Sequence, residues 1–358
     1  TGVTLGAAQN LVITGDEDVN LSDIGGAETV IADSVNASGS SGIITINVID
    51  TVANTADVDS ITTGSGNDLI GSIVGTGVVT VASNGGNDTI TITQAGATST
   101  FDGGDGNDTF NADEVAQVVM IGGKGADNFA TAANLAGTII GGDDSDTITI
   151  DGAGAVTFAS TFAFSGIEEL DITASNGVVS MTGAQLAANA TLIIDGDAAA
   201  DIFNVSTGST AAVARSADLS NVTIKTGATA AITVTGGAGV DTITGGVASE
   251  TFTQTIGADV YEGGAGTGVD TYVAVTNLTA AGSSNASVGS IVNLGTTAVT
   301  SADVIANATS FISGSATSVA GGTAAHLYAA NVAGNSAEAD ILGGIENVTG
   351  TAQIDYVV

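Results

Sequence analysis

Short apolar stretches separated by glycine-containing turns recur along this chain. Residues 69–74, 78–82, 89–93 and 147–150 are rich in Val, Ile and Thr, which favour strands because their branched side chains pack well on a pleated surface. Similar stretches stand at 11–14, 29–32, 41–49, 98–101, 117–121, 137–140, 155–159, 164–173, 191–197, 201–207 and 221–227. Two alanine-rich segments, 184–190 and 323–333, favour single short helices. The pattern predicts an all-β protein.

Five acidic glycine turns lie between these stretches at nearly even spacing. They occupy residues 63–70, 83–90, 103–110, 122–129 and 141–148. Their aspartates are Asp68, Asp88, Asp108, Asp127 and Asp146, separated by 20, 20, 19 and 19 residues. A fixed period of this length is typical of a solenoid, in which each coil stacks on a copy of itself. We expect a parallel β-roll or β-helix over residues 61–159, with the acidic turns along one edge.

The composition of the turns predicts calcium binding. Calcium takes six to eight oxygen ligands from carboxylates and backbone carbonyls. Glycine lets a turn bend tightly enough to point several carbonyls at one place. In the turn at 103–110, Gly103, Gly104 and Gly106 supply the bend and Asp108 the charge. A single such turn is better explained as an ordinary Gly/Asp/Asn loop, but five in register favour stacked calcium sites.

A second block of turns has a shorter spacing. Residues 236–244, 245–253 and 254–262 follow one another directly, and their acidic residues Asp241, Glu250 and Asp259 fall nine residues apart. The segment 263–273 repeats the theme with two extra residues before Asp270. We expect these four acids to be calcium ligands as well.

Both blocks resemble the RTX family, whose nonapeptide is Gly-Gly-x-Gly-x-Asp followed by any residue, a large apolar residue and any residue. Full matches stand at 103–111, 122–130 and 236–244. They begin with Gly103-Gly104, Gly122-Gly123 and Gly236-Gly237, have Gly106, Gly125 and Gly239 in the fourth position, and have Asp108, Asp127 and Asp241 in the sixth. The other turns depart from the pattern at Thr63, Ser83, Asn84, Asp144 and Glu250, so we expect weaker sites there. The resemblance implies a parallel β-roll with Ca²⁺ held between glycine-rich turns.

Charge dominates the composition. The 358 residues include 38 acidic and three basic ones (Lys124, Arg215 and Lys225), for a net charge of −35. A hydrophobic content of 43% and a mean hydropathy of +0.41 argue against disorder. Acidic repulsion opposes compaction, so we expect a divalent cation to be coupled to folding. So few positive charges exclude nucleic acid as a partner, and no apolar run is long enough for a membrane-spanning helix.

The absent residue types are also informative. Without cysteine there are no disulfides and no thiolate metal sites. The lack of proline is consistent with uninterrupted ladders of hydrogen bonds in stacked strands.

These patterns divide the chain into five segments. Residues 1–60 are β-rich and form either degenerate coils or an assembly strand, and 61–159 form the calcium-binding solenoid. Residues 160–235 are β-rich coils without clean acidic turns, where Asp197 and Asp201 suggest an irregular site. Residues 236–275 are the nonapeptide block, and 276–358 form a β-rich C-terminal segment for assembly or export.

The chain lacks the signatures of a catalytic site. It has one histidine, His326, no cysteine, no HExxH zinc pair and no GxSxG nucleophile elbow. We therefore expect no enzymatic activity. A calcium-dependent enzyme with an unrecognised carboxylate pair stays open as an alternative, because acids are plentiful.

The RTX resemblance implies a secreted protein at the cell surface or outside the cell, exported by type I secretion. We expect a calcium-dependent structural subunit of a surface layer or extracellular filament. Its partner would be the chain itself, joined through solenoid ends at residues 1–14 and 345–358, because unpaired strand edges there need a cap or a neighbour. Cell-surface polysaccharide is a second expected partner.

The alternative is a binding or spacer module of a large RTX adhesin. An ice-binding adhesin would carry columns of Thr and Asn beside the calcium turns. The matching positions here hold only a partial column, Asn67, Asn87 and Asn107 followed by Ala126 and Ser145. We expect no ice-binding face.

Overall fold

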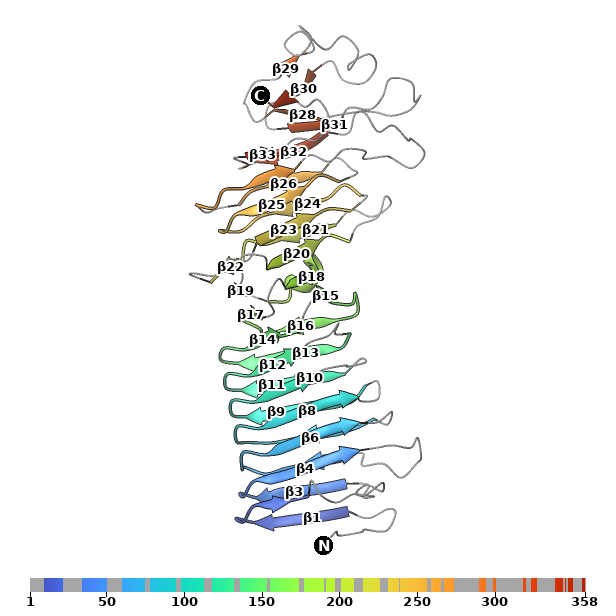
Figure 1. Cartoon of the computed structure of the whole chain (residues 1–358), viewed down its shortest axis with the longest axis vertical. Coiled ribbons are helices and arrows are strands. Elements are labelled where there is room, and N and C mark those ends of the chain that lie inside the picture. The colour runs from blue at the N-terminus through green and yellow to red at the C-terminus, as the bar shows by residue number, and fades with distance from the viewer. Residues whose placement is uncertain are drawn as a thin grey trace. The chain divides into compact units, whose positions relative to one another are not determined.

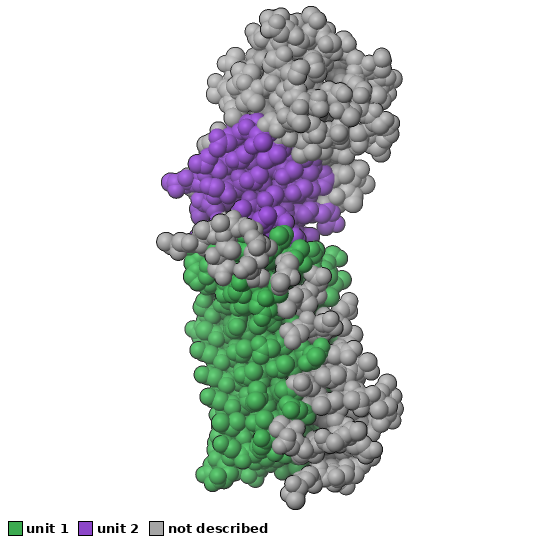
Figure 2. All heavy atoms as spheres, viewed as in Figure 1, with its two compact units in different colours: residues 1–179, 188–201, 225–229 green, residues 180–187, 202–224, 230–358 purple. Residues whose placement is uncertain are grey.

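The computed structural model shows an all-β parallel solenoid (Figure 1). Its contacts divide the chain into two compact units: unit 1 comprises residues 1–179, 188–201 and 225–229, and unit 2 residues 180–187, 202–224 and 230–358 (Figure 2). The residues that the structure describes are 10–21, 34–49, 60–74, 78–94, 98–112, 118–131, 136–152, 155–173, 177–189, 191–196, 201–208, 215–225, 231–237, 239–255, 259–264, 267–273, 290–293, 299–300, 318–319, 323–326, 339–343, 345, 347–349 and 356–357.

Two parallel sheets build unit 1. The first contains, in spatial order, β1 (Asn10–Gly15), β3 (Ser34–Ser40), β5 (Ser60–Thr62), β7 (Thr80–Ala82), β9 (Thr100–Asp105), β11 (Val119–Lys124), β13 (Thr138–Asp143) and β16 (Ala163–Ser165). The second contains β2 (Val19–Asn20), β4 (Ile44–Ile49), β6 (Leu69–Val74), β8 (Thr89–Gln94), β10 (Thr109–Ala112), β12 (Asn128–Thr131), β14 (Thr147–Ile150), β17 (Glu169–Ile172) and β19 (Leu192–Gly196). One strand of each sheet and the turn between them make one coil.

The coils stack in register, so that equivalent residues form columns. In the second sheet Ile90 pairs with Phe110 and Phe110 with Phe129. All three are buried, and the rings of Phe110 and Phe129 stack with centroids 4.8 Å apart. In the first sheet Phe101 pairs with Met120, which is also buried. The core is therefore a set of continuous apolar columns between the two sheets.

Unit 2 has the same kind of coil. One sheet contains β20 (Ile202–Ser206), β23 (Ala231–Thr235), β25 (Glu250–Thr253), β27 (Thr271–Val273) and β33 (Asn347–Thr349) in this order. Another contains β21 (Ser216–Asp218), β24 (Thr242–Thr244), β26 (Val260–Glu262), β32 (Ala339–Gly343), β31 (Thr323–His326), β28 (Ser290–Asn293) and β34 (Tyr356–Val357). The remaining described strands are β15 (Ala155–Thr157), β18 (Val178–Thr182), β22 (Val222–Ile224), β29 (Val299–Thr300) and β30 (Ser318–Val319). Antiparallel pairing occurs between β28 and β31, β31 and β32, and β29 and β30.

The strands extend further into the glycine turns than the sequence predicts. The stretches 69–74 and 147–150 coincide with β6 and β14, but β9, β11 and β13 continue to Asp105, Lys124 and Asp143. The reason is the register, which pairs Gly123 with Gly104. The turns themselves stack as part of the sheet.

The helix predictions are only partly confirmed. The expected helix at 184–190 is α1 (Gly183–Leu186), a single turn in which Gln185 Oε1 accepts the N–H of Thr182 at 2.7 Å. The expected helix at 323–333 is wrong over 323–326, because this segment is β31 and pairs with strands on both sides. Residues 327–333, like the strand predicted at 29–32, lie outside the described residues. No helix in the described part of the chain has the length and hydrophobicity needed to cross a membrane.

Candidate functional site

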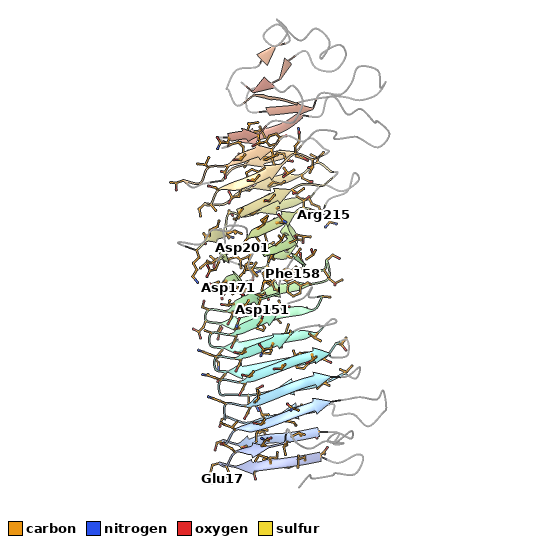
Figure 3. All side chains as sticks on the ribbon, viewed as in Figure 1. Glu17, Asp151, Phe158, Asp171, Asp201 and Arg215 are labelled. Carbon is orange, nitrogen blue, oxygen red and sulfur yellow. The ribbon has the colours of Figure 1, made fainter. Side chains whose placement is uncertain are left out.

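The acidic turns of unit 1 follow one another along one edge, on the left in Figure 3, where Glu17 marks the corresponding turn of the first coil. Their carboxyl groups are inside the turns rather than on the surface. All nine acidic residues predicted as ligands are at most 5% exposed: Asp68, Asp88, Asp108, Asp127, Asp146, Asp241, Glu250, Asp259 and Asp270. Burial at this level is exceptional for carboxylates, which are almost never fully buried unless paired.

One oxygen of each unit 1 aspartate links two coils. The backbone N–H of Asp88 donates to Oδ1 of Asp108 at 2.8 Å, and the N–H of Asp108 donates to Oδ1 of Asp127 at 2.7 Å. The same bond joins Asp68 to Asp88 and Asp127 to Asp146, at 2.6 and 2.9 Å. We call this column the carboxylate ladder. Hydrogen bonds from backbone N–H groups to a carboxylate are among the stronger ones in proteins.

The other oxygen has no such bond in four of these turns. Oδ2 of Asp88, Asp108, Asp127 and Asp146 is buried and has no hydrogen-bond partner. Burial raises the pKa of Asp88 to about 8, and neighbouring carboxyls add to the effect while the ladder hydrogen bond opposes it. For the same main reason the pKa of Asp127 rises to about 7 and those of Asp108 and Asp146 to about 6. Each of these groups needs a proton or a cation to be stable in the folded protein.

The glycines face these free oxygens. A Cβ atom at Gly103 would collide with Oδ2 of Asp108. A Cβ atom at Gly122 would collide with Oδ2 of Asp127 and lie 2.6 Å from the carbonyl oxygen of Gly141 in the next coil. The space that these glycines leave is therefore lined by a carboxylate oxygen and, at Gly122, by a carbonyl oxygen of the adjacent coil.

The other glycines predicted in these two turns of unit 1 allow an unusual backbone conformation. Gly104, Gly106, Gly123 and Gly125 have φ between +100° and +134°, a region that residues with a Cβ rarely adopt. A carbonyl oxygen of the preceding coil also lies against each of them, which leaves no room for a side chain.

The donor set fits a hard cation. It consists of oxygens only, from carboxylates and backbone carbonyls, which are the ligands of calcium. Within the described residues no three His, Cys, Asp or Glu side chains converge closely enough to hold a metal ion by themselves. Backbone carbonyls would have to complete the coordination.

The turns of unit 2 alternate between two edges. The register pairs β24 with β26 and β25 with β27, so Asp241 and Asp259 share one edge while Glu250 and Asp270 share the other. The N–H of Asp241 donates to Oδ1 of Asp259 at 2.8 Å, and the N–H of Glu250 donates to Oδ1 of Asp270 at 2.9 Å. The ladder contact of unit 1 is thus repeated on both edges.

The second oxygens of unit 2 have different surroundings. Both carboxylate oxygens of Glu250 are buried and have no hydrogen-bond partner of good geometry. Burial and the neighbouring Asp270 carboxyl raise the pKa of Glu250, and the backbone N–H of Gly246 opposes this shift. Oδ2 of Asp241 accepts the N–H of Gly237 at 2.9 Å. Gly236 and Gly239 lie in the same turn, and a Cβ atom at Gly236 would collide with the hydroxyl of Thr255.

Sequence reasoning missed Glu168, which extends the carboxylate ladder by one coil. The N–H of Asp146 donates to Oε2 of Glu168 at 2.9 Å. Asp18 is exposed and accepts the N–H of Ile43 in the following coil at 2.8 Å, the direction opposite to that of the carboxylate ladder. Asp201, labelled in Figure 3, is fully buried and accepts the N–H of Gly177 at 2.8 Å. Asp197, proposed with it as an irregular site, lies outside the described residues. The signal for Glu168 was its distance of 22 residues from Asp146, close to one coil.

An asparagine ladder runs beside the carboxylates in the opposite direction. Oδ1 of Asn67 accepts the N–H of Asn87 at 2.8 Å, Asn87 accepts that of Asn107 at 2.9 Å, and Asn107 accepts that of Ala126 at 3.0 Å. The sequence marked these residues as a partial column. Their amide oxygens join successive coils.

The ion pairs of the lysines do not involve the four aspartates whose Oδ2 atom has no hydrogen-bond partner. In the described part of the chain, the ion pairs join Lys124 to Asp105 and Lys225 to Glu169 and Asp195, all at 2.7 Å. These side chains are at least partly exposed. The charge of these four aspartates is therefore left to protons or to a bound cation.

The fold and the turns define a class: a parallel β-solenoid whose coils are joined by buried carboxylates. No family model, curated protein or solved structure matches this chain. The solenoid is compatible with an RTX-like β-roll, and membership of the RTX family stays a prediction from the residues.

Proposed function

We propose that this chain is a secreted structural protein whose solenoid is stabilised by calcium, and that it serves as a subunit of a surface layer or extracellular filament. The observation that carries the proposal is the column of buried carboxylates in which Asp88, Asp108, Asp127 and Asp146 each keep one oxygen without a hydrogen-bond donor. Four such groups in one column are costly to fold without a counter-charge.

Calcium suits these turns better than a proton. At neutral pH the carboxyls of Asp108 and Asp146, whose pKa values are about 6, would have lost their protons. A divalent ion held by the aspartates and by carbonyls such as that of Gly141 would neutralise more than one acid and join two coils. Binding would then contribute directly to folding.

The route to assembly is the pairing of strand edges. The ends of a solenoid present backbone N–H and C=O groups that another chain can pair with. We propose residues 1–14 and 345–358 as the joining segments, with a second copy of the chain as the partner. Of these segments the structure describes 10–14, 345, 347–349 and 356–357. Extracellular location, type I secretion and contact with cell-surface polysaccharide belong to the same proposal and are supported by the resemblance of the turns to RTX repeats.

Negative-stain electron microscopy of the purified chain in calcium and in chelator, with circular dichroism on the same samples, tests this function. Ordered filaments or sheets that dissolve in chelator, with loss of β signal, support a calcium-built polymer. A chain that stays a folded monomer in both conditions would contradict it and favour a spacer module of an adhesin.

A further inference from the structure

Resting on the proposed function, we infer that calcium binds only at those turns whose carboxylate lacks a hydrogen-bond donor on its second oxygen, and that Asp68, Asp241 and Asp259 hold their turns by hydrogen bonds instead. The cation positions are then Asp88, Asp108, Asp127, Asp146 and Glu250. A full match to the nonapeptide is therefore not sufficient for calcium binding. The turn at 236–244 matches fully, but its Asp241 is one of the carboxylates held by hydrogen bonds.

Asp241 is surrounded by donors. Its Oδ1 accepts the N–H of Arg215 at 3.0 Å, and its Oδ2 accepts both the hydroxyl of Thr207 at 3.1 Å and the N–H of Gly237 at 2.9 Å. Thr207 and Arg215 come from elsewhere in unit 2. A cation at this carboxylate would have to displace donor hydrogens that already point at both oxygens.

Asp259 is held in the same way. Its Oδ1 accepts the N–H of Asp241 at 2.8 Å, and its Oδ2 accepts the hydroxyls of Thr255 at 2.9 Å and Tyr261 at 3.2 Å. The hydroxyl of Thr255 also lies against Gly236. Thr255 therefore occupies the space next to Gly236. The equivalent space next to Gly122 in unit 1 is lined by a free carboxylate oxygen and a carbonyl oxygen.

Asp68 differs from the rest of the unit 1 column. Its Oδ1 accepts the N–H of Ile44 at 2.7 Å, and its Oδ2 accepts the N–H of Gly64 at 3.3 Å. Thr63 stands in this turn where the full matches have their first glycine, and its hydroxyl donates to the carbonyl of Ser83 at 3.1 Å.

Two turns that depart from the nonapeptide have the environment of a cation site. In the turn of Asp88, the hydroxyl of Ser83 is fully buried and, like Oδ2 of Asp88, has no hydrogen-bond partner. At Gly245, a Cβ atom would lie 2.8 Å from Oε2 of Glu250 and would collide with the carbonyl oxygen of Gly263. The turn of Glu250 therefore offers a carboxylate oxygen next to a carbonyl oxygen, as the turn of Asp127 does, and the turn of Asp88 holds two buried oxygens without hydrogen-bond partners.

A matched pair of variants tests the inference, because Asp127 and Asp241 are the aspartates of two full nonapeptide matches. The full chain is dialysed to equilibrium against buffered CaCl₂, and bound calcium is measured by atomic emission. Asp127→Asn should lower the bound calcium by about one ion per chain or weaken that position by about tenfold. Asp241→Asn should leave both quantities unchanged, because no cation is expected at this carboxylate.

Glu250→Gln and Asp259→Asn repeat the comparison on the two edges of unit 2, so that misfolding of one variant does not remove the test. Circular dichroism and hydrogen exchange in calcium establish that each variant is folded. Equal loss of calcium in Asp127→Asn and Asp241→Asn, with a wild-type chain that binds calcium, would overturn the inference alone. A wild-type chain that binds no calcium would overturn the proposed function.

Discussion

At the scale of the residue, the two oxygens of each buried aspartate have separate roles. In Asp127, Oδ1 accepts the backbone N–H of Asp108, while Oδ2 has no partner and faces Gly122. The first contact fixes the side chain, and the second leaves a charge to be neutralised. Stability should therefore depend on whatever binds at the second oxygen.

The calcium-free protein should lose stability as the pH rises. The folded-state pKa values of Asp88 and Asp127, about 8 and about 7, lie above the ordinary value of 3.8. The folded chain therefore binds these protons more tightly than the unfolded chain. This stabilisation is complete below the ordinary pKa and is lost as the pH rises through the folded values. Denaturant titrations in chelator between about pH 4 and pH 8 measure the effect.

Two variants separate this effect from general acidic repulsion. Asp127→Asn removes a buried carboxyl and should flatten the pH dependence. Asp143→Asn removes the same charge from an exposed side chain and should leave the dependence nearly as in the wild type. Stability that rises with pH in chelator, or equal slopes in the two variants, would contradict the assignment.

Gly104→Ala should destabilise the protein by more than ~1 kcal/mol, because Gly104 has φ of +100° and an added Cβ would collide with the carbonyl of Asn84. Gly85→Ala is the control, since the nearest atom to its added Cβ is 3.5 Å away. Denaturant midpoints in calcium give the comparison. Similar midpoints for the two variants would show that the coils leave room for a side chain at Gly104, against the close approach described above.

At the scale of the element, each strand contributes alternately to the core and to the surface. The burial of β10 shows this pattern, with Phe110 inward and Asn111 partly exposed. Outward neighbours on adjacent strands are mostly uncharged, as in Thr89 and Thr109, which pair across β8 and β10. This arrangement avoids like charges directly opposite each other, which would weaken the sheet.

Acids do face one another where β17 meets β19, and a lysine compensates. Asp171 pairs with Asp195, and Lys225 lies 2.7 Å from both Asp195 and Glu169. One of the three basic residues of the chain therefore stands where acidic side chains are adjacent on the sheet surface.

Phe110→Ala should reduce the free energy of unfolding by about 3–5 kcal/mol, because it removes a fully buried ring stacked on Phe129. Thr109→Ala, at the neighbouring outward position, should change it by less than about 0.5 kcal/mol. Equilibrium denaturation in saturating calcium measures both. A small loss for Phe110→Ala would mean that the apolar columns do not carry the stability of the coils.

At the scale of the whole molecule, repulsion between acidic residues opposes a fold that is held together by contacts between adjacent coils. Each coil mainly contacts its neighbours, so stability is close to a sum of coil and interface contributions. The net charge of −35 acts on all coils at once. A counter-charge held between the coils therefore affects the whole solenoid and not a single turn.

Monovalent salt should stabilise the calcium-free chain. Raising the ionic strength from about 0.01 M to about 1 M shortens the Debye length from about 30 Å to about 3 Å and screens acidic repulsion. The thermal midpoint in chelator should rise with NaCl, and the rise should be smaller in calcium, where part of the charge is already neutralised. A midpoint in chelator that does not change with NaCl would indicate that repulsion is not what limits the stability of the chain.

The spacing of the turns was enough to predict the fold class. The steps of 19 and 20 residues between Asp88, Asp108 and Asp127 reappear as the register of stacked strands, because residues one period apart occupy equivalent positions in successive coils. The strands between the turns could also be predicted from the sequence, because their apolar stretches recur at the same spacing. The segment 323–326 was misjudged because its alanine-rich composition favours a helix, whereas pairing with strands on both sides decides its conformation.

The sequence by itself determined that acidic residues lie in glycine turns, that the turns repeat at one coil and that the strands between them build an all-β solenoid. Only the tertiary structure decided which carboxylate oxygens are free. Thr207, which hydrogen-bonds to Asp241, stands 34 residues away from it, and no local pattern connects them. The physical reason is that the hydrogen-bond partners of a turn come from other coils, and the registration of those coils depends on the length of every connection between them.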